Sequence, residues 1–388
     1  MMEKRKIRIS KKLLRRVLLV LVAALVVIFG SLYAVSRTFG RVPLSNLADV
    51  FTAFSVKGDG AFPYIADAGS VEQMVQIGGG VGVLRTDKID ILTRSGAPLQ
   101  SVRHTYTAPA VDACGGRVLL FDRGGTRYML LSKTAELRTG ETEKPILTAA
   151  LAEDGRIAVA VSSDNTKSIL TVYKPNGSAF FQFKCVSEYI TDVAFTHNGV
   201  ALTVVGAKNA SAYSRLLVLR FDKTEPVADC TYDGTSLFHV QANGSTVTAC
   251  SSTLLTTLRH KTQQPETPFG SDTLQFFSAD PSGKASLALL TYGNEHASKL
   301  RGVSANGETS FEVDCGEKLK GMSRSSAYTS VLTDDAVLTY NNSGLCVGTL
   351  HLVQAARSIC LNDRTVFVLF NDRIEAFPAS GEHTQPEE

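Results

Sequence analysis

Two hydrophobic patterns divide the chain. The first is one unbroken apolar run, residues 17–35, which holds no charged side chain. As a helix, these nineteen residues rise about 28 Å, which is close to the hydrocarbon thickness of a bilayer. The second pattern begins near Tyr64, where short apolar and β-branched runs alternate with Gly, Asn, Asp and Ser turns. Such punctuation is typical of short strands and predicts an all-β body.

The apolar run predicts a single-pass transmembrane helix. Residues 1–16 hold eight Lys and Arg against one Glu, so we expect the N-terminus to be cytoplasmic and the body to lie outside the cytoplasm. A cleaved signal peptide is the alternative, because small residues cluster at 34–36. However, the run is longer than the roughly 7–15 residues of a usual signal h-region. A buried core helix fits less well, since such helices are amphipathic or shorter.

Within the body, an apolar strand that leads into an Asn-Gly-like turn recurs about every 37 to 47 residues, in eight visible copies. Clear members are 169–173 before Asn176-Gly177 and 300–304 before Asn306-Gly307. Another apolar strand precedes each of them. Four short antiparallel strands at this spacing are typical of a propeller blade. We therefore predict a β-propeller with eight blades, with seven as the next alternative and a run of β-sandwich domains as the competing architecture.

The ends of the repeat array predict how the ring closes. The last copy, residues 358–377, supplies only three strands before a polar tail. A strand near 61–66 precedes the first full copy and would supply the fourth strand. That exchange would close the ring and cover its free edges.

Five segments follow from these patterns. They are a basic cytoplasmic tail (1–16), the transmembrane helix (17–35), a juxtamembrane linker (36–57), the β-propeller (58–378) and a disordered tail (379–388). Apolar residues at helical spacing over 43–54 predict a short amphipathic helix in the linker. The lipid bilayer is then the first expected partner, through residues 17–35.

Charge and cysteine usage exclude several classes of function. The net charge is +3, and residues 1–16 carry +7, so the rest of the chain carries −4. A mildly acidic body without a basic stripe predicts no nucleic-acid partner. The seven cysteines never form Cys-x-x-Cys, which argues against zinc ribbons and thioredoxin-like sites. Cysteines in predicted strands are expected to be small buried hydrophobes, while an isolated disulfide stays open.

No catalytic or metal-binding motif is found in the sequence. The glycine-rich stretch 78–82 lacks the Gly-Lys-Ser/Thr ending of a phosphate loop, and the residues after it continue as a strand. Gly-x-Ser-x-Gly, His-x-His and His-Glu-x-x-His are missing. We therefore predict no catalytic residue, no metal site and no cofactor.

The body resembles WD40-like and quinoprotein-like propellers in its Asp-Gly and Asn-Gly turns and in the strand and turn 172–177. Together with its apolar run, the chain resembles an uncharacterised, single-span propeller family of Gram-positive clostridia, described as a domain of unknown function. This resemblance covers about residues 15–378, notably 157–177 and 190–205, and implies topology and fold but no functional residue. Because the chain has no Trp, the Trp-Asp dipeptide of WD40 repeats and the tryptophan motifs of quinone-dependent dehydrogenases are missing.

Loop length is the asymmetry that points to function. Most connections between the second and third strands of a copy are short, but three are long and polar: 162–168, 206–214 and 292–299. In a propeller these three emerge on one face, and binding residues concentrate in loops on a rigid scaffold. The candidate binding residues are Asp164, Asn165, Lys167, Lys208, Asn209, Tyr213, Asn294, Glu295 and His296.

Two functions are consistent with these features. The first is a non-enzymatic binding or scaffolding module, tethered outside the cytoplasm at the cell envelope, whose partner is an envelope protein or a glycan. The second is an extracytoplasmic hydrolase or lyase with its site on the propeller axis. The second function requires at least two titratable side chains that converge within hydrogen-bond reach. Because no catalytic motif is found, the sequence favours the binding module.

Overall fold

The computed structural model describes residues 62–264, 266–280, 282–294 and 297–385. All of them belong to one compact unit, Asp49–Glu388. The expected transmembrane helix (17–35), the linker (36–57) and its amphipathic helix (43–54) lie outside the described residues. Within the described ranges, no helix is long and apolar enough to cross a membrane.

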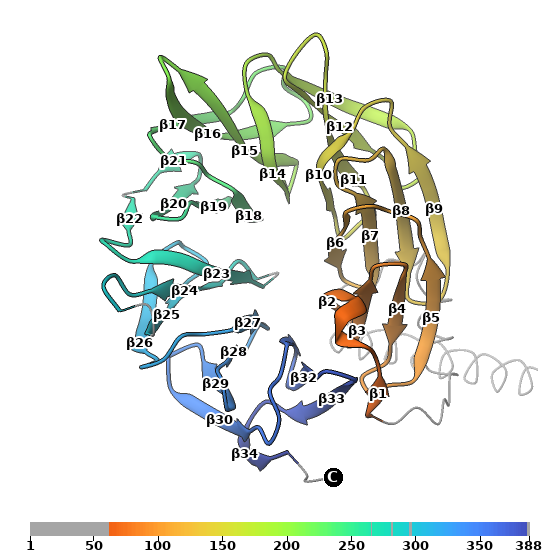
Figure 1. Cartoon of the computed structure of the whole chain (residues 1–388). Coiled ribbons are helices and arrows are strands. Elements are labelled where there is room, and N and C mark those ends of the chain that lie inside the picture. Colours follow the sequence, from red (N-terminus) through yellow and green to blue (C-terminus); the bar gives the residue numbers. More distant parts are fainter. Residues whose placement is uncertain (1–61, 265, 281, 295–296, 386–388) are drawn as a thin grey trace, which may run out of the picture. The chain divides into compact units, whose positions relative to one another are not determined.

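Eight sheets form a β-propeller, all antiparallel except for one added strand in blade 7, and the first strand of each blade lies nearest the axis (Figure 1). A 3-10 turn, η2 (Ala68–Ser70), leads into the first blade. Blade 1 consists of β2 (Val71–Ile77), β3 (Gly80–Arg85), β4 (Lys88–Leu92) and β5 (Pro98–Arg103), and blade 2 of β6 (Pro109–Cys114), β7 (Arg117–Asp122), β8 (Arg127–Ser132) and β9 (Glu136–Glu141). Blade 3 consists of β10 (Ile146–Leu151), β11 (Ile157–Ser162), β12 (Ser168–Tyr173) and β13 (Ala179–Cys185), and blade 4 of β14 (Tyr189–Thr196), β15 (Gly199–Lys208), β16 (Ser211–Arg220) and β17 (Ala228–Asp233).

The remaining blades repeat the same order with small additions. Blade 5 consists of β18 (His239–Asn243), β19 (Thr246–Cys250), β20 (Leu254–Arg259), β21 (Thr262–Gln263) and β22 (Thr267–Pro268), and blade 6 of β23 (Thr273–Ala279), β24 (Ala285–Leu290), β25 (Ser298–Val303) and β26 (Thr309–Asp314). Blade 7 consists of β27 (Gly321–Arg324), β28 (Tyr328–Leu332), β29 (Ala336–Asn341), β30 (Cys346–His351) and β34 (Gly381–Thr384), and blade 8 of β31 (Ser358–Asn362), β32 (Thr365–Leu369), β33 (Arg373–Pro378) and β1 (Tyr64–Ile65). The prediction of eight blades is confirmed.

Blade 8 joins the two ends of the repeat array. Its outermost strand is β1, which pairs with β33 so that Tyr64 lies opposite Ile374. The expected closing strand is therefore present, and the edge of β33 is paired. The expectation of a disordered tail over 379–388 is wrong for part of it, because β34 pairs in parallel with β30 of blade 7. This pairing covers the outer edge of β30, which sequence periodicity alone could not indicate.

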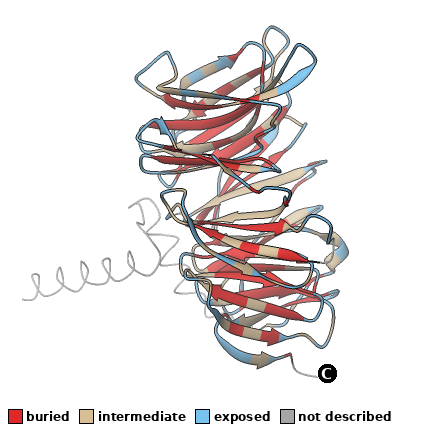
Figure 2. Cartoon of the chain, turned by 90° about the vertical axis from the view of Figure 1, so that its left-hand side faces the viewer, coloured by how far each residue is buried: buried red, intermediate tan, exposed pale blue. Residues whose placement is uncertain are grey.

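Burial follows the position of each strand in its blade. The second and third strands are buried on both sides, as in β7, where every residue is buried. The outermost strands alternate instead, as in β9, where exposed and half-buried residues take turns. Figure 2 shows this gradient as buried residues on the middle strands and exposed ones at the outer edges and turns. Since a blade alone buries little, packing both faces of each blade against neighbours provides the core.

The cysteines follow the expected structural role in part. All seven lie in described residues, and all are free thiols. Cys185 and Cys250 are buried, as expected for small hydrophobes, whereas Cys230 and Cys315 are half-buried. Burial raises the pKa of the Cys185 thiol to about 11, so this thiol stays protonated at neutral pH.

The antiparallel order of strands defines two faces of the ring. We call the face that carries the turns between second and third strands, together with the segments leading from one blade to the next, the connection face. The opposite face carries the other turns, including Gly78–Gly79 between β2 and β3. Both of these glycines have positive φ (35° and 91°), and the expectation of a turn between two strands at 78–82 is confirmed.

Candidate functional site

The first of the three expected loops lies on the connection face of blade 3. It joins β11 to β12, and its residues Asp164, Asn165 and Lys167 are exposed. Asp164 forms an ion pair with Lys144. The Lys167 ammonium lies 5.6 Å from the ring centre of Tyr189, the first residue of β14 in blade 4. This loop therefore reaches the next blade.

The second expected loop, 206–214, is not a loop, and that expectation is wrong. Strands β15 and β16 stay paired as far as Lys208 opposite Ser211. Between them, Asn209 and Ala210 have φ of 51° and 64°, the signs required for a type I′ turn. The hairpin extends past β14, whose last partner on β15 is Val205. Lys208 and Asn209 therefore lie at the tip of a projecting hairpin.

The third expected loop joins β24 to β25 in blade 6. Asn294 lies in its described part, where its N–H donates to the Thr291 carbonyl over 3.3 Å. Glu295 and His296 lie outside the described residues. Tyr292 is 78% exposed. The candidates of blades 3 and 4 therefore lie on adjacent blades. Asn294 lies apart from them, because blade 5 separates blade 6 from blade 4.

Tyr213 points back from the hairpin to the seam between blades 3 and 4. Its hydroxyl donates to Oε1 of Glu188 over 3.0 Å, and Nη1 of Arg215 donates to the same oxygen over 2.9 Å. Glu188 is buried in the segment that leads from blade 3 to blade 4. Burial raises the pKa of Glu188, but the bonds from Arg215 and Tyr213 outweigh it and hold that pKa below its usual value. Arg215 also binds Asp229.

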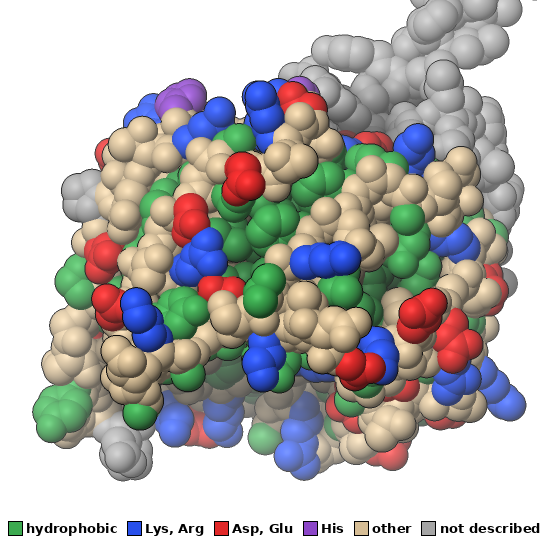
Figure 3. Space-filling model, turned by 90° about the horizontal axis from the view of Figure 1, so that it is seen from above, with side chains coloured by type: hydrophobic (Ala, Val, Ile, Leu, Met, Phe, Trp, Pro, Cys, Tyr) green, Lys and Arg blue, Asp and Glu red, His purple; other side chains and the backbone are tan. Residues whose placement is uncertain are grey.

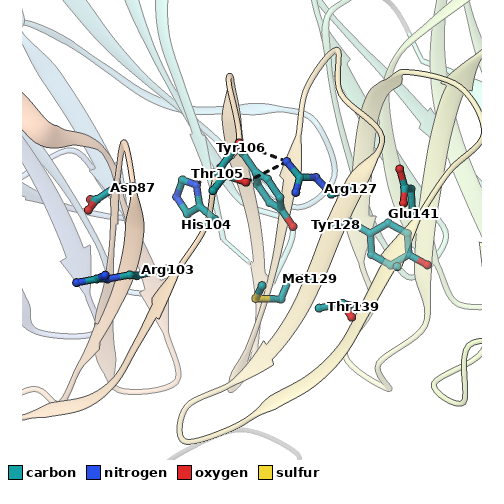
Figure 4. A pocket seen from close by; sticks show the side chains of 11 residues that line it. Asp87, Arg103, His104, Thr105, Tyr106, Arg127, Tyr128, Met129, Thr139 and Glu141 are labelled. Atoms are coloured by element: carbon teal, nitrogen blue, oxygen red, sulfur yellow. Dashed lines mark hydrogen bonds between the residues drawn. The ribbon is translucent and has the colours of Figure 1, made fainter.

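A groove of about 790 Å³ opens on the connection face between blades 1 and 2 (Figure 4). One wall is the segment that follows β5, with His104, Thr105 and Tyr106. The other wall comes from β8 and β9, with Arg127 and Met129 on β8. The remaining lining residues are Asp87, Arg103, Tyr128, Thr139, Gly140 and Glu141. Its volume is typical of a ligand site.

Arg127 holds a fixed position at the groove. Its Nη2 donates to the Thr105 hydroxyl over 3.0 Å and more weakly to the Thr105 carbonyl over 3.4 Å. Its guanidinium lies 5.5 Å from the ring centre of Tyr106, the geometry of a cation–π contact. Burial raises the pKa of Tyr106 to about 12, so its phenol stays protonated. Among the described residues, no Asp or Glu forms an ion pair with Arg127.

His104 supports the wall of the groove, and both of its ring nitrogens are hydrogen-bonded there. Its Nε2 lies 3.1 Å from the Arg85 carbonyl, which requires this nitrogen to donate. Its Nδ1 accepts from the backbone N–H of Tyr106 over 3.3 Å. Burial lowers the pKa of His104, which favours this neutral form. His104 is therefore a positioning residue for the segment that carries Tyr106.

The axis holds a second cluster of titratable groups. Asp192 on β14 accepts the N–H of Val193 and, through Oδ2, the N–H of Val240 on β18, each over 2.9 Å. The same Oδ2 lies 3.9 Å from Nδ1 of His239. Burial raises the pKa of Asp192 to about 7. In the part of the chain that the structure describes, no three His, Cys, Asp or Glu side chains are grouped to hold a metal ion.

Sequence reasoning missed the groove because its walls come from two neighbouring blades. A usable signal exists in the segments that lead into blades. Residues 104–108 (HTYTA) lead into blade 2 without an acid, whereas 186–188 (VSE) lead into blade 4 with one. An arginine in the third strand, Arg127 or Arg215, follows in both blades. The segment without an acid before Arg127 thus distinguishes this seam from the seam before blade 4.

Comparison with solved structures identifies the same architecture at low sequence identity. BamB from Moraxella catarrhalis matches with a TM-score of 0.52 at 12% identity, over 81% of this chain and 98% of that one. The computationally designed Ika8 protein matches with a TM-score of 0.58 at 12% identity, over 82% and 98%. Apo AztD from Citrobacter koseri matches with a TM-score of 0.51 at 11% identity, over 84% and 94%. These likenesses concern the fold alone.

The comparison with curated proteins found no match. A family model does match, over residues 64–377, which is the whole propeller from β1 to β33. The expected resemblance to WD40-like propellers and to a domain of unknown function is confirmed, whereas the clostridial origin and the anchor stay predictions. The chain therefore belongs to the Family of unknown function (DUF5711).

Proposed function

We propose that this protein is a non-enzymatic binding or scaffolding module of the cell envelope. Residues 17–35 tether it to the membrane as a single-pass helix with a cytoplasmic N-terminus, and the propeller faces the outside. The partner is an envelope protein or a glycan. The observation that carries the proposal is the groove of about 790 Å³ on the connection face of a closed ring. A closed ring holds such a recess in fixed geometry, which lowers the ordering cost of binding.

The projecting hairpin of blade 4 adds contact surface to the same face. Next to it, Val186 is 72% and Tyr189 is 45% exposed. Exposed apolar side chains close to polar loop residues are a common composition of interaction surfaces. Lys167 contacts Tyr189, and the other candidates Asp164, Asn165, Lys208 and Asn209 lie on the second-to-third-strand turns of blades 3 and 4. Their role in binding is part of the proposal.

In-cell photo-crosslinking tests the binding role. A crosslinking amino acid is placed at Thr139 in the groove, at Lys208 on the hairpin tip, and at Ser95 on the opposite face as a control. We expect discrete crosslinked species from the first two positions, and loss of the Lys208 species when the hairpin is shortened to end at Val205 and Ser214. Identical species from Ser95, or unchanged capture with the shortened hairpin, would contradict the proposal.

The tether has its own test. Replacing residues 17–35 by a cleavable secretion signal should move the protein from the membrane fraction to the medium or the soluble envelope fraction. A protease added to intact cells should degrade the propeller of the tethered protein. A propeller that resists protease on intact cells but not in lysates would place it in the cytoplasm and overturn the proposed topology.

The alternative function is a hydrolase or lyase with its site on the axis. One observation favours it, because Asp192 has its pKa raised to about 7 and lies 3.9 Å from His239. However, both Asp192 oxygens already accept hydrogen bonds from backbone N–H groups, which is the arrangement of a structural carboxylate. An activity on envelope material that is lost in Asp192→Asn but kept in Asp112→Asn would support this alternative over the binding module.

A further inference from the structure

The third strand carries a cation in several blades, and the partners of these cations can be compared within one chain. In blade 4, Arg215 pairs with Glu188 over 2.9 Å. In blade 6, Lys299 pairs with Asp272 over 3.0 Å. Both acids lie in the segment that leads into the blade, and both are at least 90% buried. Two seams are therefore closed on the connection face by a carboxylate of the chain itself.

In blade 2 the cation is Arg127, and no carboxylate of the described residues forms an ion pair with it. Arg127 occupies the same register position as Arg215. Each lies on the third strand, opposite the residue that comes five positions after the start of the second strand. The segment that leads into blade 2 offers Arg127 only Thr105, an uncharged partner. Glu141, which lies opposite Arg127 on β9, accepts instead from Thr126 over 3.0 Å.

A tyrosine lies close to the arginine in both blades, although it comes from a different segment in each. In blade 4, the tyrosine hydroxyl of Tyr213 donates to the carboxylate that Arg215 binds. In the groove, Tyr106 lies under the Arg127 guanidinium, and its hydroxyl makes no hydrogen bond within the described residues. Figure 4 shows Tyr106 and Arg127 side by side at the head of the groove, with Met129 and Thr139 below them. A guanidinium and a phenol are the donors that bind Glu188 in blade 4.

We propose that the groove between blades 1 and 2 binds an extended segment of a partner protein, and that an acidic side chain of this segment pairs with Arg127. Charge complementarity supports an acidic residue, because a guanidinium held by Tyr106 and Thr105 binds carboxylates with little further ordering. The internal counterparts support a polypeptide, because Glu188 and Asp272 are themselves carried by extended chain segments lying in a seam. The outermost strands β5 and β9 border the groove, and within the described residues each is paired on one edge only, so the other edge can form main-chain bonds. This inference rests on the proposed binding function.

Fluorescence anisotropy with the full-length chain in detergent tests the inference. The probes are three fluorescein-labelled decapeptide pools that share randomised flanks and differ at the central residue, which is Glu, Gln or Lys. We expect the Glu pool to bind about tenfold more tightly than the Gln pool, and the Lys pool to bind least. Equal binding of the three pools, or binding of oligogalacturonate or citrate with no binding of any peptide pool, would overturn the proposal.

Three variants assign the effect to the groove. Arg127→Gln should weaken binding of the Glu pool about tenfold, and Arg127→Lys should restore part of it. Thr105→Glu places an acid at the residue whose hydroxyl Arg127 already binds, so it should occupy Arg127 and block the Glu pool without unfolding the ring. Arg156→Gln is the matched control, because Arg156 also stacks on aromatic rings, Phe195 and Phe221, but lies outside the groove.

The outcomes separate this inference from the function on which it rests. Unchanged binding in both Arg127→Gln and Thr105→Glu would overturn the acidic-segment site. If in-cell crosslinks from Lys208 persist in that case, the binding function stands and only the assignment of the groove fails. If neither crosslinks nor peptide binding are found, both fail.

Discussion

The seam between blades 1 and 2 and the seam between blades 3 and 4 are built from equivalent strands, but only the first is open. In the closed seam, Phe180, Phe181 and Phe183 of β13 pack with Phe195 and Phe221 of blade 4. In the open seam, β5 supplies only Leu99 and Val102 at the equivalent places. Figure 3 views the rim of blades 3 and 4, where hydrophobic side chains gather between charged ones. Side-chain volume on the outer strand therefore differs between the two seams.

Charge differs between the same two seams. Arg215 in the closed seam is bound by Glu188 and Asp229, and Tyr213 adds a hydrogen bond to Glu188. Arg127 in the open seam donates hydrogen bonds to Thr105 and stacks on Tyr106, and no carboxylate of the described residues pairs with it. Three phenylalanines and one buried acid thus distinguish the closed seam from the seam that holds the groove. Because the strands are equivalent, single substitutions can test which of these differences matters.

The largest effect is expected from removing volume in the closed seam. Phe181→Ala should lower the free energy of unfolding by about 2–3 kcal/mol, because a half-buried ring that lies 5.2 Å from the ring of Phe221 would leave a gap. Urea denaturation of the wild-type protein and of the Phe181→Ala variant measures this difference in free energy. Val102→Ala, in the open seam, is the matched control with an expected loss of about 1 kcal/mol. Equal losses in the two variants would show that packing in the two seams contributes equally to the free energy of unfolding.

Removing the acid of the closed seam should have a smaller effect. Glu188→Gln should lower the free energy of unfolding by about 1–2 kcal/mol, because the buried carboxylate loses charge-assisted bonds while Arg215 keeps Asp229. The variant should also free Tyr213, which would lower protection of the adjacent backbone in hydrogen exchange. Unchanged stability would mean that Asp229 alone neutralises Arg215.

Lowering the pH should affect the two seams differently, because the open seam contains a histidine and the closed seam contains a glutamate. The pKa of His104 is lowered from about 6.5, so its contribution is present above pH 6.5 and is lost as the pH falls towards its folded pKa. The pKa of Glu188 is lowered from about 4.5, so its contribution persists until the pH falls below 4.5. Between pH 7 and 5, hydrogen exchange corrected for intrinsic rates should speed up around β5 and β8 but not around β13 and β16. His239, whose pKa burial also lowers, adds a separate response at β18.

The measurement must be local, because Asp192 acts in the other direction. Its pKa is raised to about 7, so protonation stabilises the folded state and stability falls as the pH rises through 7. A global melting temperature would mix this term with that of His104. Equal acceleration around β13 and β16 between pH 7 and 5 would contradict the assignment of the acid response to the open seam.

The smallest effect is expected from adding the missing acid. Thr105→Glu should raise the free energy of unfolding by about 0.5 kcal/mol, because the new ion pair with Arg127 stays partly exposed. The same substitution on an Arg127→Gln background should give no gain, and this double-mutant cycle is read by urea denaturation. A gain that persists without Arg127 would mean that the new carboxylate interacts elsewhere.

The repeat pattern of the sequence determines most of the architecture. Each blade contributes two continuous apolar strands between turn residues, so periodicity alone predicts eight blades. The three-stranded last copy and the early strand also predict that β1 completes blade 8, which the pairing of Tyr64 with Ile374 confirms. The long connections of blades 3 and 6 are predicted correctly too. These features are local, since strand and turn propensities act over a few neighbouring residues.

The tertiary structure decides the rest because the relevant neighbours are distant in sequence. The segment 206–214 reads as a polar loop, yet Ala207 and Ala212 pair as a hairpin once Asn209 and Ala210 form the turn. Strand β34 forms only because β30 offers an edge. Whether Arg127 has a counter-charge depends on which segment the preceding blade places beside it, and that is a property of the closed ring. Sequence alone determined the ring, and packing between blades determined which of its seams is left open.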